Sequence, residues 1–490
     1  MYKTIYEKRN ISMMMDLYEL TMANGYFQNE DRERKVAFDV FYRRKPDDGG
    51  FAIFAGLEQV IEYVEQMRFE EEDIEYLRSQ NLFDEAFLAY LKDFRFHGDL
   101  YAFPEGTVMY PNEPVITVVA DIVEAQIVET EILAQIKHQS LIATKACRIV
   151  RAADGRPVSD FGARRAHNND AAIYGARAAF IGGVKGTATV SAGQQFGIPI
   201  GGTMAHSWVM YYKDELESFR KFAALYPDNC ILLVDTYNVL ESGIPNAIRV
   251  FREMQEAGIR SAKFGIRIDS GDLAYLTRKS RKMLDEAGFP EAQIVISNSL
   301  DEITIGSILK QGGCVDSFGV GERLITAKSE PVFGAVYKLC GVEKEDGTFD
   351  PRIKVSETIE KVTNPGLKDV WRIYNEDGFA MADLITQRGE TVDTSVSYRF
   401  IDPKKPWKRL YFKNCTAKSL QQLVVRGGER VLPGKTTREI AQYVEHQLTS
   451  EIWQEEQRFE FPHIHYMDMS PAYYEMKMEL LNETAGHGQP

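Results

Sequence analysis

The chain has 490 residues, of which 44% are hydrophobic and 27% are charged, and its formal net charge at pH 7 is -14. This length and composition allow a large buried core divided among two or three domains. The negative charge repels polyphosphate backbones and argues against nucleic acid as a partner, so any phosphate ligand must bind in a locally basic pocket.

The early apolar stretch at residues 11–15 is too short for a membrane span. Asp16 and Glu19 follow it closely, whereas a span needs about 20 apolar residues. The five cysteines are widely spaced and include no C-x-x-C pair. We therefore expect a cytoplasmic protein with no membrane partner and no disulfide framework.

The first part of the chain mixes strand and helix patterns. Alternation predicts a strand over residues 36–42, and helical spacing predicts a helix over residues 56–67. Two further strands are expected within residues 107–120. These elements predict an N-terminal α+β domain, which we assign to residues 1–136.

From about residue 157 the pattern changes to short β-rich runs followed by helical segments, which is typical of parallel βα units. Strands are expected at residues 157–161, 186–190, 198–203, 230–235, 264–269, 293–298 and 317–320. Helices are expected at residues 207–225, 245–257, 273–287 and 302–310, and Gly258, Gly288 and Gly312 are expected to end helices. Seven such units favour a (β/α) barrel over an open sheet, and we assign it to residues 137–345.

The last part of the chain, residues 346–490, again has a mixed α+β pattern. A helix is expected near residues 466–481, where Met and Tyr are frequent. We expect this C-terminal α+β region to pack partly on the N-terminal domain. The whole chain is therefore predicted to be an α/β protein whose barrel carries the chemistry.

In (β/α) barrels the chemistry lies in the loops that follow the strands, so the polar residues and glycines at those positions form one candidate set. Its members are Asp160, Arg164, Arg165, Thr187, Thr203, His206, Asp235, Arg267, Asp269, Ser270, Gly271, Asn298, Gly319 and Gly321. The set combines cations, carboxylates and glycines, which together can bind phosphate, ribose and metal-bound water.

Residues 265–272 give the most informative pattern in this set. Strand alternation places Arg267 and Asp269 on the same side of the sheet. An arginine can bind phosphate, a carboxylate can hold ribose hydroxyls, and Ser270 with Gly271 can open the next helix toward an anion. A helix N-cap with a structural salt bridge explains the same residues about equally well.

Two other positions have both a functional and a structural explanation. Gly319 and Gly321 follow a strand and allow backbone N–H groups to approach a phosphate, although a simple turn is the commoner explanation. His206 follows a glycine-rich strand end and begins a helix, where a phosphorylated imidazole would be favoured. For an isolated histidine, a capping or packing role is the commoner explanation.

Five motifs of the chain occur together and in one order. They are Met15–Phe27, Ser159–Arg165, Gly202–Ser207, Val234–Tyr237 and Arg267–Asp272. In these motifs the chain resembles the nicotinate phosphoribosyltransferase family, and the resemblance covers nearly all of its length. It implies a type II phosphoribosyltransferase that joins nicotinate to phosphoribosyl pyrophosphate in NAD salvage. Such an enzyme is expected to have an irregular (β/α) barrel with an N-terminal α+β domain, and to form a homodimer with shared active sites.

The resemblance also implies roles for individual residues. Phe161 and Tyr18 of the partner subunit would enclose the pyridine ring, while Arg164 and Arg267 would bind the nicotinate carboxylate and the phosphates. The ribose and the water shell of Mg²⁺ would be held by Asp235, Asp269 and Asn298, and the 5'-phosphate by Gly319 and Gly321. Further substrate contacts are assigned to Arg165, Thr187, Thr203, Ser270 and Gly271.

By the same resemblance, ATP is a co-substrate and is hydrolysed through a phosphohistidine at His206. The added negative charge would order Mg²⁺ and pyrophosphate and favour nucleotide formation. His206, Asp235 and Asp269 are the predicted catalytic residues. Mg²⁺ is expected to bind together with the substrate near Asp235 and Asp269, and not at a preformed metal site.

Two alternatives from the sequence stay open. A nicotinamide-specific relative has an aspartate where this chain has Ala188, within Lys185–Thr189. Without that carboxylate the amide N–H2 lacks an acceptor and the anionic nicotinate meets no like charge, which favours the acid as substrate. The second alternative is a non-catalytic barrel that binds sugar phosphates, but the chain keeps the complete set of His206, Asp235, Arg267 and Asp269.

Overall fold

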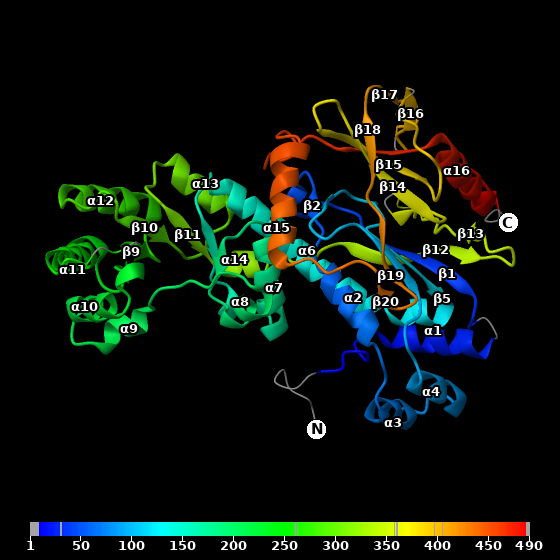
Figure 1. The fold of residues 1–490 in the computed structure, drawn as a ribbon, viewed down its shortest axis with the longest axis horizontal. Helices are drawn as coiled ribbons and strands as arrows, with labels where there is room; N and C mark the ends of the chain where they lie inside the picture. Colours follow the sequence, from blue (N-terminus) through cyan, green and yellow to red (C-terminus); the bar gives the residue numbers. More distant parts are fainter. Residues whose placement is uncertain are drawn as a thin grey trace. The chain divides into compact units, whose positions relative to one another are not determined.

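The structure is a computed structural model that describes residues 9–29, 32–259, 261, 263–356, 358, 361–395, 397–403 and 405–486 (Figure 1). The chain forms two compact units. The central unit is Ile142–Pro331, and the discontinuous unit combines Met1–Leu141 with Val332–Pro490. The predicted three-part division at residues 136 and 345 stays a prediction.

The central unit is built on a six-stranded sheet in the order β7-β6-β11-β10-β9-β8. All of its ladders are parallel. The strands are β6 (Val158–Asp160), β7 (Gly186–Thr187), β8 (Cys230–Leu233), β9 (Phe264–Ile268), β10 (Gln293–Ile296) and β11 (Ser317–Val320). Residues such as Leu232 and Ile266 are fully buried, as strands covered on both faces require.

The strand expected at residues 198–203 does not form, and this prediction is wrong. The segment makes a single parallel bridge, between Ile200 and Thr187. Pro199 cannot donate to a ladder, and Gly201 and Gly202 weaken strand formation, so the pairing stops after one residue pair. The result is an irregular (β/α) barrel, which confirms the predicted fold class.

Helices follow the strands of the central unit, and α10, α11 and α12 pack against β8, β9 and β10 respectively (Figure 1). Their bounds are α7 (Asn169–Ile181), α8 (Val190–Phe196), α9 (His206–Tyr211), α10 (Glu215–Leu225), α11 (Ile244–Glu256), α12 (Leu273–Glu286), α13 (Glu302–Lys310) and α14 (Glu322–Ile325). The predicted helix ends at Gly258, Gly288 and Gly312 are confirmed, because these glycines adopt φ values of 72°, 89° and 74°.

The single helix expected over residues 207–225 is in fact two helices, α9 and α10. The side chain of Asp214 accepts a hydrogen bond of 2.8 Å from the backbone N–H of Glu217. Asp214 is therefore the N-cap of α10, and an N-cap has a non-helical backbone that interrupts the helix. The helical spacing continues across this break, which is why the pattern missed it.

The discontinuous unit contains a seven-stranded sheet in the order β13-β12-β1-β5-β3-β19-β20, with antiparallel ladders. Its strands are β1 (Lys35–Tyr42), β3 (Asp99–Ala102), β5 (Ile116–Asp121), β12 (Ala335–Glu343), β13 (Phe349–Pro351), β19 (Gln422–Arg426) and β20 (Glu429–Arg430). Segments from both ends of the chain thus share one sheet.

The same unit has a second sheet in the order β17-β16-β21-β15-β14-β18 and a strand pair β2-β4. These strands are β2 (Ala52–Ile53), β4 (Val108–Met109), β14 (Lys368–Tyr374), β15 (Ala380–Gln387), β16 (Tyr398–Ile401), β17 (Arg409–Phe412), β18 (Thr416–Ser419) and β21 (Tyr466–Met469). The helices are α1 (Leu17–Gln28), α2 (Leu57–Gln66), α3 (Glu71–Ser79), α4 (Glu85–Lys92), α5 (Ile122–Ile127), α15 (Thr437–His446) and α16 (Pro471–Gly486). Helix α6 (Glu129–Ala152) begins in this unit and ends in the central one.

The predictions for the N-terminal part are confirmed by β1, α2, β4 and β5. The helix expected near residues 466–481 is only partly correct, because its first four residues form strand β21 beside β15. Proline is favoured at the first position of a helix, and Pro471 marks the start of α16. Within the described residues, no helix has both the length and the apolar character needed to cross a membrane.

A fully buried polar cluster joins separate segments of the discontinuous unit. Arg372 donates two hydrogen bonds of 2.8 and 2.6 Å to Asp383. The imidazole of His465 lies 3.4 Å from Asp383 and 3.1 Å from Glu456, and its ring stacks on Tyr110 with 3.8 Å between centroids. The Tyr110 hydroxyl donates a 2.6 Å hydrogen bond to Glu456, which completes the cluster.

Candidate active site

A cavity of about 280 Å³ lies at the carboxyl ends of the strands of the central unit. Its lining consists of Phe161, Ala163, Arg164, Arg165, Ala188, Gly202, Thr203, Met204, Ala205, Arg267, Asp269, Ser297, Asn298, Ser299, Gly319 and Gly321. These residues lie at or just after the ends of β6, β7, β9, β10 and β11 or in the segment before α9. This is the face on which (β/α) barrels carry their chemistry.

The cavity brings together most of the predicted site residues. Those that line it are Phe161, Arg164, Arg165, Thr203, Arg267, Asp269, Asn298, Gly319 and Gly321. His206, Asp235 and Ser270 are outside this lining. Nε2 of His206 lies 3.9 Å from Asp269, and Asp235 accepts hydrogen bonds from the N–H of Asp269 and the hydroxyl of Ser270. Three further predicted residues do not line the cavity. Thr187 is buried, and Gly271 has a left-handed backbone with φ of 83° just before α12. Tyr18 belongs to α1 in the discontinuous unit.

The turn after β6 is fixed by Asp160, which is fully buried. One carboxylate oxygen accepts a 2.7 Å hydrogen bond from the Thr187 hydroxyl, and the other accepts a 2.8 Å bond from the N–H of Gly162. Burial raises the pKa of Asp160, and these two hydrogen bonds oppose that shift. Thr187 therefore supports the turn that carries Phe161 and Arg164, and its hydroxyl is already occupied.

Gly319 in β11 makes room for the Phe161 ring, and Gly321 after β11 lies close to the Phe161 backbone. A Cβ atom added to Gly319 would lie 2.4 Å from the ring, and one added to Gly321 would lie 3.2 Å from the Phe161 carbonyl. The N–H of Phe161 donates a 2.7 Å hydrogen bond to Val320. The close approach of the Phe161 ring thus explains why residue 319 is a glycine. A phosphate contact by Gly319 or Gly321 stays a prediction.

Arg267 and Asp269 both face the cavity, as strand alternation predicts. One guanidinium nitrogen of Arg267 donates to the Thr203 hydroxyl, while its Nε is buried without a protein partner. Burial lowers the pKa of Arg267, and Asp269 and Asp235 act against this shift. Asp272 is the N-cap of α12, which confirms the predicted helix cap before Leu273. Capping does not account for Arg267 or Asp269.

Asp235 at the end of β8 is connected to the loop after β9. Its Oδ2 accepts hydrogen bonds of 3.0 Å from the N–H of Asp269 and 2.6 Å from the Ser270 hydroxyl. Its Oδ1 is buried and has no protein partner. A buried, unsatisfied carboxylate oxygen beside a second carboxylate fits a hydrated Mg²⁺, which prefers oxygen ligands and keeps several waters.

The described residues contain no group of three or more His, Cys, Asp or Glu side chains arranged to hold a metal ion. Asp235 and Asp269 supply two carboxylates only. Any divalent cation at this position therefore needs further ligands, and the phosphates of a substrate are suitable ones.

His206 begins α9 at the edge of the cavity, directly after the lining residues of segment 202–205. Its Nδ1 lies 3.1 Å from the Thr236 hydroxyl, and its Nε2 lies 3.9 Å from a carboxylate oxygen of Asp269. The side chain is 40% exposed. The imidazole is therefore both accessible and close to the carboxylates of the site.

Several residues of the site were not predicted from the sequence. Ser297 donates a hydrogen bond to Asp269, Thr236 contacts His206, and Ser299 lines the cavity. Each is next in sequence to a strand-end residue that was predicted. Including one residue on either side of each predicted residue would have identified them. Met204 and Ala205 line the cavity without polar side chains and gave no such signal.

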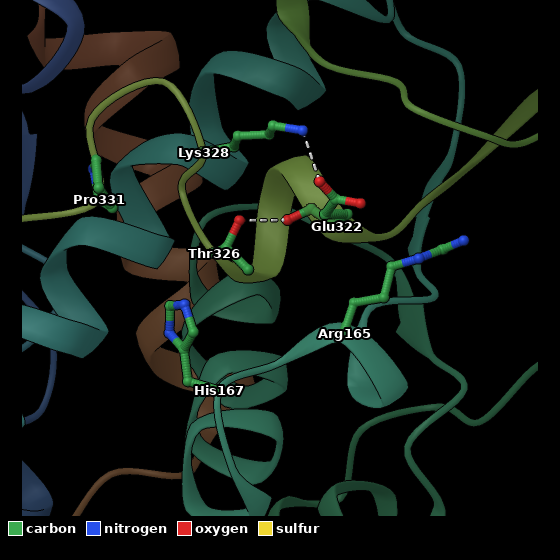
Figure 2. A pocket seen from close by; sticks show the side chains of 6 residues that line it. All are labelled: Arg165, His167, Glu322, Thr326, Lys328 and Pro331. Carbon is green, nitrogen blue, oxygen red and sulfur yellow. Dashed lines mark hydrogen bonds and ion pairs between the residues drawn. The ribbon is translucent and has the colours of Figure 1, made fainter.

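A second hollow of about 510 Å³ lies on the central unit (Figure 2). It is lined by Arg165, His167, Glu322, Thr326, Lys328 and Pro331. Lys328 forms a 2.7 Å ion pair with Glu322, and the Arg165 side chain extends away from His167 and Thr326. Although this hollow is larger, Arg165 is its only predicted site residue among those described, so the smaller cavity is the candidate active site.

Comparison with known proteins gives one consistent result. Three family descriptions match: the nicotinate phosphoribosyltransferase N-terminal domain at residues 13–137, the nicotinate phosphoribosyltransferase family at residues 157–397, and the C-terminal domain at residues 367–477. A nicotinate phosphoribosyltransferase of Bacillus subtilis is 43% identical, and the match covers 97% of this chain and 96% of that protein. One from Mycobacterium tuberculosis is 42% identical over 78% of this chain and 79% of its own.

The crystal structure of human nicotinic acid phosphoribosyltransferase has the same fold. It superposes with a TM-score of 0.83 at 25% identity, and the match covers 96% of this chain and 100% of that one. The sequence and fold comparisons therefore agree on the family. The chain is an enzyme that belongs to the nicotinate phosphoribosyltransferase family.

Proposed function

We propose that this enzyme forms nicotinate mononucleotide and pyrophosphate from nicotinate and phosphoribosyl pyrophosphate in NAD salvage, and that ATP hydrolysis drives the reaction. The observation that carries this proposal is the composition of the cavity. An aromatic ring (Phe161), two cations (Arg164 and Arg267) and a carboxylate (Asp269) line a single space. These groups match the ring, the acidic groups and the sugar of the two substrates.

The pyridine ring of nicotinate would bind against Phe161. Aromatic stacking adds about 1 kcal/mol beyond the burial of the ring. Arg164 would pair with the nicotinate carboxylate, since a guanidinium binds a carboxylate through two parallel hydrogen bonds. Tyr18 of the partner subunit would cover the other face of the ring in a homodimer, and the 43% exposure of Tyr18 in one chain is compatible with this role.

The phosphoribosyl group would occupy the opposite part of the cavity. Arg267 has a buried Nε without a protein partner, which a phosphate oxygen would satisfy. Asn298 and the carboxylates of Asp235 and Asp269 would hold the ribose hydroxyls. Mg²⁺, when bound with the substrate near these carboxylates, would neutralise charge on the pyrophosphate.

In the proposed reaction the bond between ribose C1 and the pyrophosphate oxygen breaks, and the pyridine nitrogen forms a bond to C1 from the opposite face. Positive charge develops on the sugar while negative charge develops on the leaving group. Asp235 and Asp269 stabilise the sugar, and Arg267 stabilises the pyrophosphate. The residues act mainly by positioning the two substrates, so no general acid is required.

The coupling to ATP is assigned to His206. A ring nitrogen would accept the terminal phosphoryl group of ATP and release ADP, and water would later hydrolyse the phosphohistidine to phosphate. The accessibility of the imidazole and its 3.9 Å distance from Asp269 support this assignment. A phosphoryl group there would add negative charge next to the proposed Mg²⁺ position.

The choice of nicotinate over nicotinamide is assigned to the absence of a carboxylate at position 188. Ala188 lines the cavity, and its N–H donates a 2.8 Å hydrogen bond to the Asp160 carbonyl. A methyl group at this position can neither repel the nicotinate carboxylate nor accept a hydrogen bond from an amide.

The direct test is nucleotide formation from phosphoribosyl pyrophosphate with nicotinate or nicotinamide, each with and without ATP, while ADP release is followed. We expect product from nicotinate, more product with ATP, and ADP released in step with it. Product only from nicotinamide would contradict the Ala188 assignment. Product from neither would contradict the proposed function.

A further inference from the structure

Two loops of the cavity follow the neighbouring strands β10 and β11. Asn298 and Ser299 line the cavity after β10, and Gly321 lines it after β11. Asn298 and Ser299 adopt φ values of 84° and 48°, a backbone conformation that is unfavourable for residues with a side chain. Such a conformation persists only where surrounding contacts enforce it.

An ion pair links the ends of these two loops, because Asp301 ends the first loop and Arg323 belongs to α14, which begins directly after Gly321. Asp301, two residues after Ser299, caps α13 by accepting a 2.8 Å hydrogen bond from the N–H of Thr304. The other carboxylate oxygen of Asp301 accepts a hydrogen bond from Arg323, which lies two residues after Gly321. The Asp301 and Arg323 side chains are only 15% and 31% exposed, so water screens this pair weakly.

Helix α13 has further contacts that hold its first turn. Its first residue, Glu302, is buried and accepts hydrogen bonds of 2.8 Å from Lys145 and 2.9 Å from Arg148, both on α6. These contacts hold the start of α13 on the central unit. Loss of Arg323 would therefore release the loops without detaching the helix.

We propose that the Asp301–Arg323 ion pair is a positioning device that fixes the distance between the loop of Asn298 and the loop of Gly321. The inference rests on the proposed function, in which these loops bind the phosphoribosyl group. Phe161, proposed to bind nicotinate, is on the turn after β6, which Asp160 holds separately. The ion pair therefore controls the affinity for phosphoribosyl pyrophosphate and not for nicotinate.

Two substitutions remove the ion pair and are chosen to change little else in the structure. Arg323→Met removes the charge and keeps a long side chain, while Asp301→Asn removes the charge and keeps a residue that can cap α13. Lys328→Met is the matched control, because it removes the adjacent Lys328–Glu322 ion pair, which is 59% and 41% exposed (Figure 2). The KM of each substrate, kcat and the thermal midpoint are measured for the full-length chain.

We expect Arg323→Met and Asp301→Asn each to raise the KM for phosphoribosyl pyrophosphate by about tenfold to about a hundredfold, as a misplaced binding group does. The KM for nicotinate should change by less than about twofold, and Lys328→Met should match the wild type. The double variant should resemble either single variant, because both remove the same interaction. Arg323→Lys should recover much of the affinity.

Three results would overturn the proposal. The first is an Arg323→Met enzyme with the same KM values as Lys328→Met. The second is a parallel rise of both KM values together with a lower thermal midpoint, which would indicate a general structural role. The third is loss of folding in Arg323→Met combined with wild-type KM values in Arg323→Lys and Asp301→Asn. Failure of the proposed function is recognised separately, because the wild type would then form no nicotinate mononucleotide.

Discussion

At the scale of single residues, the site separates side chains that face the cavity from side chains that support them. Arg267 and Asp269 line the cavity, whereas Thr187 lies outside the lining and donates a hydrogen bond to the Asp160 carboxylate. Ser297 does both, because it lines the cavity and donates a hydrogen bond to Asp269. Supporting residues of this kind fix the orientation of the groups that bind substrate. Substitutions at cavity-facing positions therefore test the chemistry most directly.

Ala188→Asp should reverse the substrate preference. A carboxylate at this position would repel nicotinate and offer an acceptor to the amide of nicotinamide. We expect kcat/KM for nicotinate to fall by about a hundredfold or more, because like charges in a dry pocket cost several kcal/mol. Steady-state kinetics with both substrates measures this change. Ala188→Asn is the neutral control, and equal effects of Asp and Asn would contradict the charge argument.

His206→Ala should separate nucleotide formation from ATP hydrolysis. Without the imidazole no phosphohistidine forms, so ATP-dependent ADP release should be lost while a slower ATP-independent transfer continues. Both rates are measured in one assay that follows ADP and nicotinate mononucleotide. His167→Ala in the second hollow is the control and should keep both rates. Full coupled ATP hydrolysis in His206→Ala would refute the phosphohistidine.

At the scale of helices and strands, close contact between β11 and the turn after β6 shapes the ring subsite. Gly319→Ala would place a Cβ atom 2.4 Å from the Phe161 ring, so the ring must move. We expect the KM for nicotinate to rise about tenfold and the stability to fall by about 1 to 3 kcal/mol, as overpacking does. Kinetics and thermal unfolding measure the two effects.

Gly306→Ala in α13 is the matched control for Gly319→Ala, because a Cβ atom at Gly306 meets nothing within 4 Å. This control should keep wild-type kinetics and gain a little stability, since alanine favours a helix over glycine. A Gly319→Ala enzyme with the same behaviour would show that the Phe161 ring does not depend on this contact.

The element scale is also where prediction from sequence was most successful. The runs at residues 230–235, 264–269 and 293–298 contain β8, β9 and β10, because alternating or buried apolar runs specify strands locally. The polar residues at their ends then mark the site. Prediction failed at Pro199 and at Asp214, where a missing donor and a capping side chain interrupt an otherwise regular pattern.

Contacts between elements could not be predicted in this way. The Asp301–Arg323 ion pair joins the N-cap of α13 to α14, and the separation of these two helices depends on the packing of β10 beside β11. The steric role of Gly319 depends on the position of a ring that is far away in the sequence. No local pattern encodes either contact, because spacing along a chain does not measure distance in space.

At the scale of the whole molecule, the chain leaves the discontinuous unit at residue 141 and returns to it at residue 332. The buried cluster around His465 holds segments from both ends of the chain in this unit. Although burial disfavours a charged imidazole, Asp383 and Glu456 raise the pKa of His465 above its ordinary value of 6.5. Burial and the neighbouring Asp383 likewise raise the pKa of Glu113 well above 4.5.

Both raised pKa values make the folded state less stable as pH rises. A raised pKa in the folded state means that the stabilisation is complete below the unfolded-state pKa and is lost as pH rises through the folded-state pKa. The discontinuous unit should therefore be less stable at pH 9 than at pH 6. Denaturant midpoints of the full chain at the two pH values measure this difference.

His465→Gln should reduce this pH dependence. Removing one partner of a buried ion pair costs about 3 kcal/mol or more, and the loss should be larger at pH 6, where the imidazole of the wild type is charged. His463→Gln is the control, because His463 is exposed nearby and makes no comparable contact among the described residues. Equal destabilisation by His465→Gln at pH 6 and pH 9 would contradict the charged state of His465.

The central claim is that phosphoribosyl transfer to nicotinate takes place in the cavity at the carboxyl ends of the barrel strands. The most direct test compares the rate of nicotinate mononucleotide formation in the wild type, Asp269→Asn and Lys328→Ala. We predict that Asp269→Asn lowers kcat by about a hundredfold to about a thousandfold, as loss of a group that stabilises transition-state charge does. Lys328→Ala, in the second hollow, should leave the rate unchanged. Wild-type activity in Asp269→Asn, or a loss confined to Lys328→Ala, would contradict the claim.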